Sequence, residues 1–150
     1  MKVSCVIAFA IAVLLALCGF CDSLKTSFAD ISALESFYKS TNGENWDLVN
    51  MGATVLAYPE FYAQFGVYAS NLTGVAWNFS LDSSSMYIND PCEDPSSSGG
   101  QWIGLVCKCA SSSCNITKIS LTSGKLSGQI APELGSLASL TILDLDSNAL

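Results

Sequence analysis

The sequence of 150 residues contains no histidine and no arginine. Histidine is the usual general base near neutral pH and a common metal ligand, and arginine forms the bidentate clamps that hold phosphate and carboxylate groups. The serines have no partner base in the sequence pattern, and no motif brackets a pair of carboxylates for glycoside hydrolysis. We therefore expect no enzymatic activity, no catalytic residues, no metal site and no cofactor.

Positive charge is scarce as well. Six basic residues, all of them lysine, stand against 13 acidic residues, which gives a formal net charge of −7. Loss of Lys2 with an N-terminal leader would make the chain more acidic still. Because a negative surface repels the phosphates of nucleic acids, we expect no nucleic-acid partner and favour neutral or basic ones.

The N-terminus has the pattern of a secretory signal peptide, which we assign to residues 1–21. Lys2 precedes an uncharged apolar run over residues 6–17, and small residues lead into the polar pair Asp22-Ser23. The run is about a dozen residues long, shorter than the roughly 20 that cross a bilayer, so an uncleaved anchor is the weaker alternative. We expect no membrane span within residues 22–150 and a location that is secreted or on the extracellular side of the plasma membrane.

Cysteine usage agrees with export. Two of the seven cysteines lie in the leader, and Cys21 depends on the cleavage point. The other four are Cys92, Cys107, Cys109 and Cys114. In an oxidising compartment four cysteines so close together indicate two disulfides, with three possible pairings. A four-cysteine zinc site is the alternative, but the Cys-x-Cys spacing fits zinc knuckles poorly.

Three tripeptides of the form Asn-x-Ser/Thr are acceptors for N-glycosylation in an exported chain. They begin at Asn71, Asn78 and Asn115. A sugar on Asn115 would stand beside the first strand predicted below.

A helix is predicted over residues 27–41. Apolar residues recur at helical spacing, Ser27 followed by Asp30 resembles a capping box, and Asn42-Gly43 is a stop signal. Farther along, the aromatic-rich segment 47–73 suggests either a small core or a platform on which sugars stack, and the core is the favoured interpretation. The acidic residues Asp90, Glu93 and Asp94 are interpreted as a solvated loop rather than a calcium site.

The last 35 residues contain a repeat with a period of 24 residues. Ile116, Ile119, Leu121 and Leu126 recur as Leu140, Leu143, Leu145 and Leu150. Alternation predicts a short strand in each copy, with one row of side chains inward and the next row outward. Asn148 is predicted to place its amide inside the turn, where it bonds backbone groups, while Gly124 in the first copy cannot do so.

This spacing, together with the run Leu126-Ser127-Gly128-Gln129-Ile130, closely resembles the plant-type leucine-rich repeat of 24 residues. Residues 27–46 and 74–114 resemble the cysteine-containing N-terminal cap of such proteins, with Trp102-Ile103-Gly104-Leu105-Val106-Cys107 as the most specific segment. Gly124 and Ala131 depart from the pattern, because Asn and Pro are usual there. The resemblance implies disulfides between Cys92 and Cys107 and between Cys109 and Cys114.

The resemblance implies an α/β solenoid start: a helical, disulfide-linked cap followed by about one and a half repeats with short parallel strands. The expected domains are the leader at 1–21, the cap at 22–114 with an unusual insertion at 47–73, and the first repeats at 115–150. Since such solenoids need about three repeats or more, we expect the repeats to be truncated within a longer protein.

The function implied is that of an extracellular module that binds a protein, peptide or glycan on the concave face of the repeats. The residues predicted to contact the partner are Ser120, Thr122, Ser123, Ile142, Asp144, Asp146 and Ser147. Two alternatives stay open: the ectodomain of a membrane receptor-like kinase whose catalytic domain lies beyond residue 150, and a structural cell-wall protein.

Overall fold

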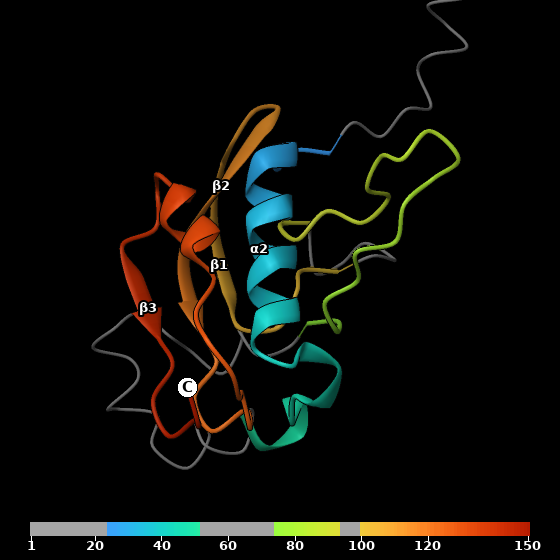
Figure 1. Cartoon of the computed structure of the whole chain (residues 1–150). Helices are drawn as coiled ribbons and strands as arrows, with labels where there is room; N and C mark the ends of the chain where they lie inside the picture. Colours follow the sequence, from blue (N-terminus) through green and yellow to red (C-terminus); the bar gives the residue numbers. More distant parts are fainter. Residues whose placement is uncertain (1–23, 52–73, 94–99) are drawn as a thin grey trace, which may run out of the picture.

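The computed structural model describes residues 24–51, 74–93 and 100–150 (Figure 1). The leader, most of the segment 47–73 and Asn71 lie outside the described residues. The helical elements are α2 (Phe28–Ser40), η2 (Gly43–Asn45) and η4 (Pro132–Ser136), and the strands are β1 (Leu105–Ala110), β2 (Ser113–Ser120) and β3 (Ile142–Asp144). The strands form one sheet in the order β1-β2-β3.

Helix α2 confirms the helix predicted near the N-terminus. The Ser27 hydroxyl accepts a hydrogen bond from the backbone N–H of Asp30 at 3.1 Å, which caps the first turn. The helix ends at Ser40, and Asn42 adopts a left-handed φ of 60°. The buried face of α2 consists of Ile31, Ala33, Leu34 and Phe37.

The expected solenoid is not what the structure shows, and the predicted fold class is wrong. The described residues form a helix packed on a three-stranded mixed sheet. The reason is the strand that precedes the repeats: β1 turns back at residues 111 and 112 and pairs antiparallel with β2, as the Cys109–Cys114 pairing illustrates. A repeat pattern alone does not contain this hairpin, because its strands come from the cysteine-rich segment.

The period of 24 residues survives as a strand register. Strand β2 pairs parallel with β3, and Ile119 lies opposite Leu143 while Ser120 lies opposite Asp144. Each pair is one period apart in the sequence. The two opposed side chains differ in burial. Ile119 on β2 is fully buried, whereas Leu143 on β3, the edge strand of the described sheet, is 40% exposed.

The predicted role of Asn148 is confirmed. Its side-chain Nδ2 donates to the carbonyls of Leu121 and Leu145, both at 2.8 Å, and its Oδ1 accepts from the backbone N–H of Leu126 at 3.0 Å. These bonds join the two copies through groups that the curved chain leaves unpaired. At Gly124, by contrast, a side chain would collide with Met51 and Leu126, so the first copy closes by packing instead.

Helix α2 and the sheet enclose the apolar core. Figure 1 shows α2 lying along the strands, with residues 74–93 passing on its other side. The side chains that are fully buried and largest are Trp102, Phe37, Ile31, Leu34, Met51, Leu105, Ile116, Ile119, Leu121 and Leu126. The backbone N–H of Gln129 and that of Ser127 donate to the carbonyls of Ser40 and Thr41, which fixes the end of α2 to the chain before η4.

Asp90 is buried, with 7% of its surface exposed, so its interpretation as part of a solvated loop is wrong. Its Oδ1 accepts from the Thr26 hydroxyl at 2.6 Å and from the Cys92 N–H at 2.9 Å. Its Oδ2 accepts from the N–H groups of Lys25 and Thr26. A carboxylate provides enough acceptor sites for these four donors, which explains why an acidic residue is tolerated here.

The structure forms two disulfides, Cys92–Cys107 and Cys109–Cys114, the pairing that the resemblance implies. The first closes a separation of 15 residues, and the second crosses the β1–β2 hairpin. Disulfides are compatible with an extracellular or secreted location. Within residues 24–51, 74–93 and 100–150, no helix has the length and apolarity needed to cross a membrane.

Replacing Cys92 and Cys107 together by alanine should destabilise the protein more than the same change at Cys109 and Cys114. The chain-entropy model gives about 3 kcal/mol for the longer loop and about 2 kcal/mol for the shorter one, whose ends are already paired in a hairpin. Denaturant midpoints and resistance to protease of the secreted variants measure the difference. Unchanged secretion and stability of both variants would contradict a role for the disulfides in folding.

Replacing Asp90 by asparagine should lower the free energy of unfolding by about 3 kcal/mol. The amide NH₂ would face backbone donors, which leaves buried N–H groups without an acceptor. Asp82→Asn is the matched control, because Asp82 also accepts two backbone N–H groups, from Ser84 and Met86, but is exposed. Equal unfolding midpoints of the two variants would show that the buried network contributes nothing special.

Candidate functional site

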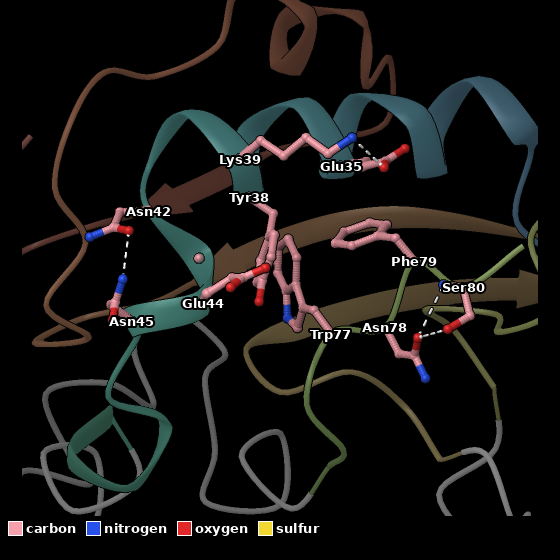
Figure 2. Close-up of a pocket in the computed structure, with 11 residues that line it drawn as sticks. Glu35, Tyr38, Lys39, Asn42, Glu44, Asn45, Trp77, Asn78, Phe79 and Ser80 are labelled. Carbon is pink, nitrogen blue, oxygen red and sulfur yellow. Dashed lines mark hydrogen bonds and ion pairs between the residues drawn. The ribbon is translucent and has the colours of Figure 1, made fainter.

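An open pocket of about 580 Å³ lies where α2, η2 and the segment 77–80 meet (Figure 2). We call it the α2–η2 pocket. It is lined by Glu35, Tyr38, Lys39, Asn42, Gly43, Glu44, Asn45, Trp77, Asn78, Phe79 and Ser80. Aromatic rings and short polar side chains therefore meet in one hollow, a combination that is typical of small-molecule sites.

Three aromatic side chains form the apolar wall of the α2–η2 pocket. Tyr38 stacks near Trp77 with ring centroids 6.4 Å apart and planes inclined by 23°. Phe79 lies 5.3 Å from Tyr38 at an angle of 54°. Trp77 is buried beneath, whereas Tyr38 and Phe79 are half-buried. The two half-buried rings thus meet as a concave corner rather than as a flat platform.

The aromatic wall is anchored to the core behind it. The indole N–H of Trp77 donates to the carbonyl of Ile103 at 2.8 Å, and Phe79 meets Trp102 edge to face at 4.7 Å. Val75 exchanges backbone hydrogen bonds with Gln101 and Ile103 just before these residues. The segment 77–80 is therefore held by the part of the chain that leads into β1.

The floor beside Tyr38 is made by η2. A side chain at position 43 would collide with the Tyr38 ring, so only glycine lets the chain pass this close. The left-handed Asn42 directs the chain away from α2, and the Asn45 Nδ2 donates to the Asn42 Oδ1 at 2.7 Å. The sequence Asn42-Gly43-Glu44-Asn45 therefore serves both as a helix stop and as a lining of the pocket.

Glu35 is the centre of a small charged network on α2. The Lys39 ammonium lies 2.6 Å from one carboxylate oxygen, and the Tyr87 hydroxyl donates to the other. Burial acts to raise the pKa of Glu35, but the hydrogen bonds from Lys39 and Tyr87 and the Lys39 charge outweigh it and hold the pKa below its usual value. Burial and the Glu35 carboxylate raise the pKa of Tyr87 to about 12.

Glu44 lies at the mouth of the α2–η2 pocket and acts on Tyr38. Burial, and then the negative charge of Glu44, raise the pKa of the Tyr38 phenol. Figure 2 shows the Glu44 carboxylate beside the ring of Tyr38. At neutral pH the pocket thus contains a protonated tyrosine next to a carboxylate.

Asn78 lies at the opposite rim and begins one of the predicted glycosylation sequons. Its Oδ1 accepts from the Ser80 hydroxyl at 2.6 Å and from the Ser80 N–H at 3.0 Å. The side chain is exposed (Figure 2). Asn115, the other predicted acceptor among the described residues, lies on β2 and is also exposed.

The residues predicted to bind a partner lie together on β2, β3 and the turns that follow. Ser120 and Thr122 are buried, and their hydroxyls donate to the Asp144 Oδ2 at 3.2 and 2.9 Å. Asp146 and Ser147 are exposed. The remaining predicted contacts, Ser123, Ile142 and Asp144, are half-buried. Partner binding by this row stays a prediction, for which Asp146 and Ser147 offer the accessible groups.

Sequence reasoning did not single out the α2–η2 pocket. Tyr38 falls within the helix predicted over residues 27–41, and residues 77–80 fall within the segment that resembles the cap, but neither was predicted to line a pocket. The signal that was present is the mixture of aromatic and amide residues in two short segments, 42–46 and 77–80. The aromatic residues for which a sugar platform was weighed, Tyr58 to Tyr68, lie outside the described residues.

Known proteins indicate no family for this chain. No model of a protein family matches the chain, and no curated protein has a significant match to it. Among the described residues, no group of three or more cysteine, aspartate or glutamate side chains is placed to hold a metal ion.

Replacing Glu35 by glutamine should lower stability at neutral pH by about 1 kcal/mol. Because the pKa of Glu35 is lowered by folding, its contribution is present above the unfolded-state pKa and is lost as the pH falls through the lower, folded-state pKa. The difference between wild type and Glu35→Gln should therefore shrink in acid. Urea unfolding at a series of pH values tests this, with Glu133→Gln on the exposed surface of η4 as control. A difference that stays constant into strong acid would refute the assignment.

Proposed function

We propose that this chain is an extracellular, non-catalytic binding module. The observation that carries the proposal is the α2–η2 pocket, an open hollow in which half-buried aromatic rings meet amide, hydroxyl and carboxylate groups. Such a lining provides apolar contact area together with a few directional hydrogen bonds, which is the general composition of ligand sites. The sequence supports export through its predicted leader and sequons.

The frame around the pocket favours binding over catalysis. The disulfide Cys92–Cys107 closes the loop that contains residues 101–103, which hold the segment 77–80, and Trp77 is fixed by its bond to Ile103. A wall held in place before binding lowers the entropic cost of association. The titratable groups in the pocket are already engaged with one another: Glu35 with Lys39 and Tyr87, and Glu44 electrostatically with Tyr38.

A second binding face is supported by the exposed Asp146 and Ser147. The Ser147 hydroxyl donates to the Asp146 carboxylate at 3.0 Å, and Asp144 beside them is held by Ser120 and Thr122. This fixed acidic row would suit a basic or hydroxyl-rich protein partner. Asp146 and Ser147 are the exposed members of the set of residues predicted to contact a partner.

A binding screen with two variants tests both faces. Secreted wild-type protein is applied to arrays of saccharides, peptides and extracellular proteins, and each hit is titrated against Phe79→Leu and Asp146→Ala. If the α2–η2 pocket is the site, Phe79→Leu should weaken binding by about tenfold and Asp146→Ala should leave it unchanged. The reverse pattern assigns binding to the acidic row. Hits that bind both variants like wild type, or an absence of hits, would contradict the proposed function of the pocket.

A further inference from the structure

We infer that the ligand of the α2–η2 pocket is a sugar ring, an inference that rests on the proposed binding function. A pyranose ring has faces rich in C–H groups and a rim of hydroxyl groups. Its C–H face packs against aromatic rings, while each hydroxyl both donates and accepts hydrogen bonds. A site for it therefore needs ring surface and mixed polar groups in one hollow, and the α2–η2 pocket is lined by both.

The apolar half of the site is the corner between Tyr38 and Phe79. Both rings are half-buried, so each retains accessible surface, and the buried Trp77 closes the space behind them. Their separation of 5.3 Å means that the two rings touch, and their inclination of 54° turns their accessible faces in different directions, so a sugar would pack on those faces and not between the rings. Stacking there would remove apolar area of both the sugar and the protein from water, which is the main favourable term for a neutral ligand.

The polar half of the site consists mainly of amides. Asn42, Asn45 and Asn78 line the pocket together with the hydroxyl of Ser80. An amide carries a donor and an acceptor side by side, which matches adjacent hydroxyls on a sugar. Local hydrogen bonds from Asn45 to Asn42 and from Ser80 to Asn78 already fix these groups, so little side-chain freedom would be lost on binding.

The amide lining, and not the charge, favours a neutral ligand over a cationic one. Lys39 is paired with Glu35 at 2.6 Å, which leaves Glu44 as the lining carboxylate outside the ion pairs found within the described residues. A cationic side chain would use Glu44 and the aromatic faces. It would leave the three amides without a complementary role, whereas a polyhydroxyl ligand uses them all.

Two sources of sugar fit this chemistry. One is a free or partner-borne saccharide. The other is the chain's own N-glycan, because the exposed Asn78 begins a sequon and lines the pocket. Tethering at the rim would give the attached sugars a high effective concentration at Tyr38 and Phe79, so even weak contacts would be populated. In that case the glycan would shield the aromatic corner and govern access of any other ligand.

The test uses N,N′-diacetylchitobiose, the first two sugars of an N-glycan, as probe in calorimetric titrations of the secreted protein. Ser80→Ala and Asn78→Gln both remove the sequon. The first variant retains Asn78, and the second retains Ser80. Ser80→Thr keeps the sequon and is the matched control. Asn115→Gln removes a glycan from a different place, which controls for a general effect of deglycosylation.

If the chain's own glycan occupies the pocket, the probe should bind Ser80→Ala and Asn78→Gln at least about tenfold more tightly than wild type, Ser80→Thr or Asn115→Gln. If the ligand is a separate saccharide, wild type, Ser80→Thr and Asn115→Gln should bind the probe alike. Ser80→Ala and Asn78→Gln, which remove or displace polar groups of the site, should then bind it no more tightly than wild type. In both cases Phe79→Leu, made in the background that binds, should weaken binding by about tenfold, whereas Phe28→Leu on the exposed start of α2 should not.

Two results would overturn the inference. The first is an absence of probe binding by every protein. The second is a hit from the screen described above that depends on Phe79, is a basic peptide and loses affinity as salt is added, because that pattern identifies a cationic ligand. The second result would leave the proposed binding function intact, whereas hits that ignore Phe79 would remove the function of the pocket together with its ligand.

Discussion

The buried carboxylate of Asp90 is the interaction on which the arrangement of this molecule depends. It accepts four hydrogen bonds. Three come from Lys25 and Thr26, just before α2, and one comes from Cys92, two residues after Asp90. Thr26, one of its donors, forms a parallel bridge with Cys114. The same carboxylate thereby connects the start of the helix to both disulfide-bonded segments, although these parts are separated by more than sixty residues. The free-energy cost of burying this carboxylate is offset because each of its oxygens accepts two hydrogen bonds.

Each consequence for the α2–η2 pocket follows from that connection. With the start of α2 fixed near Cys92, the helix lies along the sheet and presents Glu35, Tyr38 and Lys39 to the segment 77–80 (Figures 1 and 2). The segment itself is fixed by Trp77 and Val75 to residues 101–103. Two walls made by distant parts of the sequence therefore face each other without a regular element between them. The pocket is open because α2 is anchored at its start and the segment 77–80 is anchored separately, to residues 101–103.

The sequence predicted what depends on local patterns. The helix with its Ser27 cap, the strand register between Ile119 and Leu143, and the bonds of the Asn148 amide follow from periodicity or from turn chemistry within a few residues. The sequence did not predict what depends on tertiary contacts. The burial of Asp90 requires donors from Lys25 and Thr26, and the antiparallel β1 requires the hairpin that Cys109–Cys114 closes. The sequence did not predict the α2–η2 pocket for the same reason, since Tyr38 and Phe79 are in contact only in the folded chain.

The segment 77–80, which carries Asn78, is synthesised before the residues that hold it in place. Residues 101–103 and the sheet leave the ribosome later, so the segment has no tertiary partner when it first emerges. The bonds between Asn78 and Ser80, by contrast, span only two residues and form without the rest of the fold. In a chain that enters the secretory pathway, the acceptor amide would thus be presented to the glycosylation machinery in a local turn, while the aromatic corner is still unassembled. Asn78 would then be glycosylated, or left unmodified, before folding assembles the pocket beside it.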